Sequence, residues 1–71
     1  MTRSEHVEWA KGRALTFLPD DPAGAVVSML MDLERHPETA RMVSGPLGQI
    51  GMMEAADGDP ESVRRFIEGF N

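Results

Sequence analysis

Residues 21–37, DPAGAVVSMLMDLERHP, decide the fold of this chain. Asp21 is a good helix N-cap and stands directly before a proline, which is favoured at the first position of a helix. His36 also precedes a proline, and a residue in that position prefers extended backbone, so a helix should end there. The stretch therefore predicts a helix over residues 22–36.

This predicted helix is apolar around most of its circumference. A helix of that kind is either central in a fold or buried in an interface. We therefore expect it to be the structural hub. Its inner face should comprise Ala25, Val26, Met29, Leu30 and Leu33, extended by Ala23, Val27 and Met31.

Two further helices are predicted on either side of the hub. One runs over residues 3–18 and begins with the capping-box pattern Thr2-x-x-Glu5, with Ser4 as an alternative cap. The other runs over residues 60–69 and again begins with an Asp-Pro pair. Each carries an apolar stripe at helical spacing, namely Val7, Ala10, Ala14, Phe17 and Leu18 in the first and Val63, Phe66, Ile67 and Phe70 in the last.

Residues 38–57 form the third helical segment. Pro46 after Gly45 either kinks a continuous helix or begins a new one after a short break. Glycine recurs at Gly48 and Gly51, which either allows another helix to approach closely or marks a loose loop. The apolar residues at helical spacing in this segment are Val43, Pro46, Leu47, Ile50 and Met53.

The length of 71 residues allows a single helical domain over residues 1–71. We expect an all-α fold, a compact bundle of four short helices with the third kinked or broken near Gly45-Pro46. A chain this short buries only about 60% of the surface that its unfolded form exposes. It has no cysteines, so helix packing or self-association must supply the stability that disulfides or thiolate metal sites give other small domains.

The net charge of −5 argues against broad binding to phosphate backbones. No apolar run approaches the ~20 residues needed to cross a bilayer. The N-terminal residues lack the apolar core of a signal peptide. We therefore expect a cytoplasmic protein with no membrane partner, and the charge disfavours a nucleic acid as its partner.

No residue pattern predicts catalysis, a metal or a cofactor. His6 has acidic neighbours but no second histidine at a ligand spacing. Asp32 and His36 stand one helical turn apart, but a closed zinc site needs four ligands, and a histidine in a last turn interacts favourably with the helix dipole. No serine or threonine has a base and an orienting acid at a recognisable spacing. We expect no enzyme and no bound cofactor.

Four residues are candidates for partner binding: Trp9, Arg13, Met31 and Met52. Trp9 falls on the polar side of its helix beside Arg13, where a tryptophan is a typical anchor for a partner, or else packs within its own domain. Met31 and Met52 stand off the main apolar stripes. Methionines in such positions form an adaptable binding surface or fill gaps in a core.

Three stretches of the chain carry a resemblance to known proteins. Residues 5–11 read EHVEWAK, residues 22–26 read PAGAV with HPET following at 36–39, and residues 64–71 read RRFIEGFN. Together they resemble a group of small proteins encoded by phages of mycobacteria and related actinobacteria. The group has no assigned activity, so the resemblance implies a virus-encoded accessory protein in the bacterial cytoplasm and assigns no functional residues.

These observations predict a protein–protein interaction module, which binds a second copy as a homodimer or binds a host bacterial protein. The apolar second helix, Trp9 and the methionines off the stripes motivate this hypothesis. The alternative is a nucleic-acid-directed regulator or an acidic inhibitor of a nucleic-acid-binding protein, because a few short helices also outline many DNA-binding folds. Such a regulator needs a helix with a basic exposed face, and none is predicted.

Overall fold

The computed structural model describes residues 2–70, and all regular secondary structure in this range is helical. Met1 and Asn71, the ends of the predicted domain, lie outside the described residues. The Cα radius of gyration is 10.9 Å, close to the ~11 Å expected for a compact domain of this length. The predicted compact all-α fold is therefore confirmed. Its helices are α1 (Arg3–Leu15), α2 (Pro22–Glu34), α3 (Pro37–Val43), α4 (Pro46–Asp57) and α5 (Pro60–Glu68).

The described residues form five helices, so the prediction of four was wrong. The third predicted helix is divided into α3 and α4, with Ser44 and Gly45 between them. Pro46 occupies the first position of α4, because a proline inside a helix lacks an N–H group and clashes with the preceding turn. The segment is therefore broken into two helices rather than kinked at Pro46. Gly48 and Gly51 lie within α4, so they do not mark a loose loop.

α1 and α2 are both shorter than predicted. α1 ends at Leu15 rather than at residue 18, because the next residues tighten into i to i−3 hydrogen bonds and turns. α2 ends at Glu34 rather than at residue 36, because His36 is extended, with φ −119° and ψ 130°, and caps α3. The Nδ1 atom of His36 accepts the backbone N–H of Glu38 at 3.3 Å.

The predicted helix starts are confirmed. The side chains of Asp21 and Asp59 accept backbone N–H groups in the first turns of α2 and α5. Thr2 rather than Ser4 caps α1, where the Glu5 N–H donates to Thr2 Oγ1 at 3.1 Å and the Thr2 N–H donates to Glu5 Oε1 at 2.8 Å. The backbone N–H of Thr2, and then its hydroxyl, lower the pKa of Glu5 because both stabilise the charged carboxylate.

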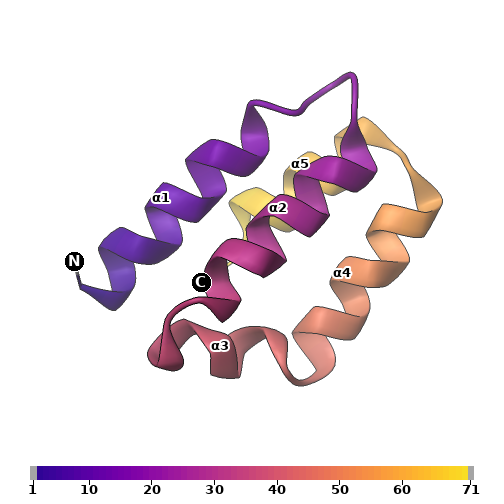
Figure 1. Ribbon diagram of the computed structural model, residues 1–71. Helices are drawn as coiled ribbons and strands as arrows, with labels where there is room; N and C mark the ends of the chain where they lie inside the picture. The colour runs from indigo at the N-terminus through magenta and orange to yellow at the C-terminus, as the bar shows by residue number, and fades with distance from the viewer. Residues whose placement is uncertain (1, 71) are drawn as a thin grey trace.

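α2 is the hub of the fold, as predicted. It packs against each of the other four helices, and Figure 1 shows α1 and α4 on its two sides with α5 behind it. Phe17 departs from the predicted stripe of the first helix, because it lies in the turn after α1 and is 39% exposed. The buried core comprises Val7, Ala10, Ala14, Ala25, Val26, Met29, Leu33, Val43, Val63, Ile67 and Phe70.

α4 packs with its glycines inward and its large apolar side chains outward. Gly51 is buried, and a Cβ added there would lie 3.2 Å from the Phe66 ring and 3.3 Å from a Leu30 methyl group. Gly48 is buried beneath the Val43 carbonyl oxygen, which a Cβ would overlap. The bare face thus lets α4 lie close to its neighbours, and it leaves an exposed α4 stripe that consists of Leu47, Ile50 and Met53.

Candidate partner-binding groove

A groove runs between α1 and α2, and its rims are two rows of residues at i, i+4 spacing. Residues at this spacing lie above one another on one side of a helix. A row on α2 floors the groove, which has a volume of about 300 Å³. The α1–α2 groove therefore has a rim of Arg13 and Phe17, an opposite rim of Val27, Met31 and Arg35, and a floor of Gly24, Ser28 and Asp32. Trp9 adjoins the first rim through its contact with Arg13.

The rims of the α1–α2 groove expose large apolar side chains. Trp9 is 38% exposed, Phe17 39%, Val27 41% and Met31 57%. Isolated apolar residues are ordinary on a protein surface, whereas a contiguous group on one face marks an interaction site. Phe17, Val27 and Met31 line the two sides of one groove, and Trp9 adjoins it beside Arg13, so one ligand could displace water from the whole group.

Arg13 is held in place on the groove by two contacts. Its Nε lies 2.9 Å from Asp32 Oδ2, and its guanidinium carbon lies 5.0 Å from the centre of the Trp9 ring, within the range of a cation–π interaction. The Asp32 side chain is only 4% exposed. Within residues 2–70, Oδ2 has no directed hydrogen bond, so the charge of Arg13 is what balances this buried carboxylate.

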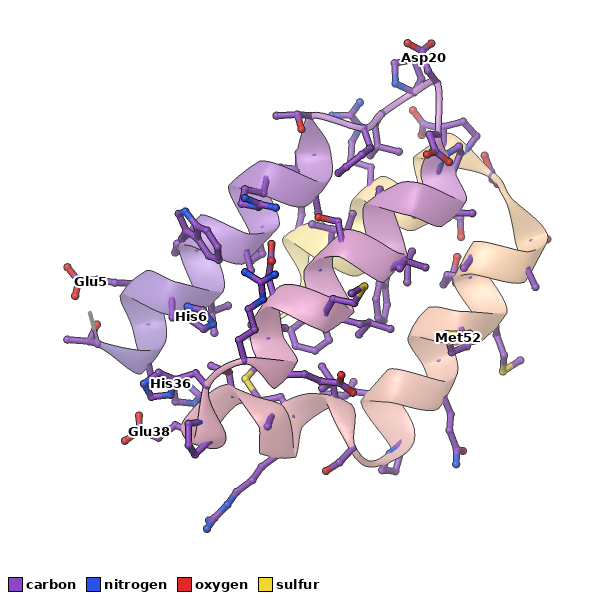
Figure 2. All side chains as sticks on the ribbon, viewed as in Figure 1. Glu5, His6, Asp20, His36, Glu38 and Met52 are labelled. Carbon is purple, nitrogen blue, oxygen red and sulfur yellow. The ribbon has the colours of Figure 1, made fainter. Side chains whose placement is uncertain are left out.

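Trp9 is supported from the protein side by His6. The His6 ring stacks on Trp9, with ring centres 5.5 Å apart and planes inclined by 22°. His6 Nε2 lies 2.9 Å from the Asp32 backbone oxygen and must be the donor, because a carbonyl only accepts. His36 lies 5.5 Å from His6 on the side of α3, and Figure 2 shows the two together. Trp9 is thus a surface residue on a rigid support rather than a core residue.

Met52 is exposed but lies apart from the other predicted binding residues. It is 58% exposed on α4 and lines a separate hollow of about 240 Å³ with Leu30 and Glu34. Figures 1 and 2 place it on α4, with α2 between it and α1. The structure therefore brings together three of the four predicted binding residues: Trp9, Arg13 and Met31.

Besides Gly24 and Ser28 of the floor, four residues of the α1–α2 groove were not among the predicted binding residues: Phe17, Val27, Asp32 and Arg35. A signal for three of them was present in the sequence. Phe17 continues the spacing of four that begins at Trp9, and Val27 and Arg35 flank Met31 at the same spacing. Asp32 has no such signal, because its burial depends on Arg13 and His6 from another helix.

Other kinds of site are not visible in the described part of the chain. Over residues 2–70, no three side chains of histidine, aspartate or glutamate come together where they could hold a metal ion. Over the same range, each helix is too short or too polar to cross a membrane. Comparison of the chain with protein-family models, with curated proteins and with solved structures found no match.

Proposed function

We propose that this protein is a small interaction module, which binds a partner protein in the α1–α2 groove and a second copy of itself through the α4 stripe. The observation that carries the proposal is the distribution of exposed apolar side chains. Within residues 2–70, seven of the eight large ones fall into these two groups, and only Met52 stands outside them. Exposed apolar surface that is gathered in this way is typical of interaction sites.

The α1–α2 groove has the features of a binding surface. Tryptophan, arginine and methionine are enriched in interfaces, and the strongest contributions come from aromatic and arginine side chains at their centre. Trp9 rests on His6, and Arg13 is held by Asp32 and Trp9. Because these side chains are already ordered, a partner would lose less conformational entropy on binding them.

The α4 stripe suits contact between two copies of this chain. Leu47, Ile50 and Met53 are 41%, 44% and 71% exposed and carry no charge. In a two-fold dimer the same patch faces itself, so an uncharged apolar patch meets no like-charge repulsion. A second copy would also add buried area to a core that is small for lack of chain length.

The sequence resemblance to phage proteins supports a biological setting for the module. It favours a host bacterial protein as the partner and the bacterial cytoplasm as the place of action. We infer that the protein acts there by binding rather than by catalysis, since the conspicuous surfaces are apolar. Expression with a fluorescent tag in a mycobacterial host would test the compartment.

Affinity capture with matched variants tests the groove. We expect wild-type protein to retain a defined host partner that Met31→Asp loses, because a carboxylate in the groove would be desolvated by the partner. Met52→Asp is the control, since Met31 and Met52 are the same residue type with 57% and 58% exposure. Equal capture by both variants would count against the groove.

Sedimentation equilibrium at high micromolar concentration tests the α4 stripe. Wild-type protein should be dimeric and Ile50→Asp monomeric. Ala23→Asp adds the same charge at an exposed position in the first turn of α2, where an acid is favourable, and should remain dimeric. A wild-type chain that stays monomeric would refute self-association without touching the groove.

A further inference from the structure

The α1–α2 groove carries an excess of positive charge, although the chain as a whole has a net charge of −5. Two arginines line it, Arg13 on one rim and Arg35 on the other, against the single carboxylate of Asp32. A basic groove attracts a ligand of opposite charge, even on a protein whose net charge is negative. The charge therefore narrows the chemistry of the partner.

Of the two arginines that line the groove, Arg35 is the one without a partner among residues 2–70. Its guanidinium makes no ion pair or hydrogen bond with any residue in the range 2–70, and it lies in the same row as Val27 and Met31. When a partner covers these apolar neighbours, water is displaced from around the guanidinium, and its attraction to an opposite charge increases. Arg35 is thus placed to receive a carboxylate at the edge of an apolar contact.

Arg13 is oriented for the same task from the opposite rim. Its ion pair with Asp32 is made through Nε, 2.9 Å from Asp32 Oδ2, and a guanidinium has five N–H donors, so donors remain for a partner. The side chain as a whole is 54% exposed. The two Nη groups of a guanidinium form a flat fork that matches the two oxygens of a carboxylate.

We propose that the α1–α2 groove binds an acidic amphipathic segment of the partner. A carboxylate of that segment lies between Arg13 and Arg35, and its apolar side chains pack against Phe17, Val27 and Met31. This inference rests on the proposed function, namely that the groove is where a partner docks, and it adds the chemistry that the groove selects.

Two other occupants fit the groove less well. In a two-fold contact between copies, Arg13 and Arg35 would be present on both sides, and like charges would face one another. Nucleic acid is bound through many phosphate contacts, whereas this groove offers two guanidinium groups, one of them balanced by Asp32. An acidic, partly apolar peptide uses both the charge and the apolar rims.

The test begins with a phage-displayed library of amphipathic helices, selected on wild-type protein and counter-selected on Met31→Asp. Peptides that survive depend on the groove, and we expect them to carry Glu or Asp beside their apolar residues. Synthetic copies without tryptophan are then titrated while Trp9 fluorescence is followed, because the chain has one tryptophan and no tyrosine.

Changing the selected acid to Gln should weaken binding by about tenfold or more, as expected for the loss of a charge-assisted pair. Arg35→Gln should weaken the acidic peptide equally and leave the Gln peptide unchanged. Arg35→Glu should instead prefer a peptide with Lys at that position. Arg64→Gln, which removes an exposed arginine of α5, is the control and should change nothing.

The outcomes separate this inference from the proposed function. Groove-dependent peptides without acidic preference would overturn the inference and leave the proposed function standing. No groove-dependent peptide at all would overturn the part of the proposed function that assigns partner binding to the groove. If a DNA duplex quenches Trp9 fluorescence in wild-type protein but not in Arg35→Gln, the ligand of the groove is a phosphate group and not an acidic peptide. If the wild-type protein is a dimer that dissociates in Arg35→Gln, the occupant of the groove is a second copy of the chain.

Discussion

Replacing Gly48 with alanine should destabilise the protein, although alanine is the better helix former. The gain in helix propensity is at most ~1 kcal/mol. Against it stands the overlap between the new Cβ and the carbonyl oxygen of Val43, a backbone atom that cannot rotate away. Overpacking of this kind costs ~1–3 kcal/mol, and the upper end applies because the backbone itself must shift. We therefore expect a net loss of about 2 kcal/mol in the free energy of unfolding.

Gly12→Ala is the matched control. Gly12 lies in α1, is exposed, and has no atom within 4 Å of an added Cβ. Only the propensity gain operates there, so this variant should be more stable by up to ~1 kcal/mol. The same chemical change is thus expected to have opposite signs in two helices, with a difference of about 3 kcal/mol.

Urea denaturation followed by circular dichroism at 222 nm gives both free energies of unfolding. Because the slope with urea scales with the surface exposed on unfolding, an unchanged slope would show that each variant unfolds from the same fold. If Gly48→Ala is as stable as Gly12→Ala, the inward packing of the α4 glycines is wrong. The outward direction of the α4 stripe would then be wrong as well.

Three further predictions concern contacts around α1. Arg13→Ala should lower the free energy of unfolding by about 2 kcal/mol, because it leaves the buried Asp32 carboxylate without a balancing charge. The loss is smaller than for a fully buried ion pair, since the Arg13 side chain is half exposed. Asp32→Asn should lower the free energy of unfolding by less, because it leaves no buried charge. If urea denaturation showed that Asp32→Asn is the more destabilising of the two changes, the pairing of Arg13 with Asp32 would be contradicted. The folded-state pKa of Glu5 is lowered, so its contribution to stability is present above its unfolded pKa and is lost as pH falls through the folded value. Thr2→Val removes the hydroxyl and keeps the backbone N–H, which is the larger cause, so in a carboxyl-carbon NMR titration the pKa of Glu5 should rise only part of the way to its ordinary value. An unmoved pKa would exclude the hydroxyl as a cause. Lys11 Nζ donates to two carbonyl groups at and just after the end of α5, each at 2.9 Å. Lys11→Met should therefore lower the free energy of unfolding by ~1–3 kcal/mol. Amide hydrogen exchange should become faster in the last turn of α5 and stay unchanged in α3.

The parts of the fold that depend on local chemistry could be predicted from the sequence. Asp21 and Asp59 each stand before a proline, and both cap helices as expected. Pro46 left two alternatives open, because a kinked helix and a broken one satisfy the same local pattern. The end of α1 could not be predicted, because Leu15 is followed by residues that continue the apolar spacing without continuing the helix.

The features that depend on contacts between helices could not be predicted. The sequence shows that α4 has a glycine strip and an apolar stripe, but the choice of inner face depends on Gly48 meeting Val43 and Gly51 meeting Phe66. The exposure of Phe17 follows from the early end of α1. In the candidate groove, a burial pattern such as that of Asp32 has no sequence signal of its own.

Photo-crosslinking from inside the groove tests the central claim most directly. Met31→p-benzoylphenylalanine and Met52→p-benzoylphenylalanine would be expressed in a bacterial host and irradiated, with covalent adducts resolved by mass. The groove at residue 31 should give one defined adduct with a partner protein, through a segment rich in acidic and apolar residues. The separate hollow at residue 52 should give none with that partner. An adduct with the same partner from residue 52 and not from residue 31 would contradict the assignment of the α1–α2 groove as the docking surface.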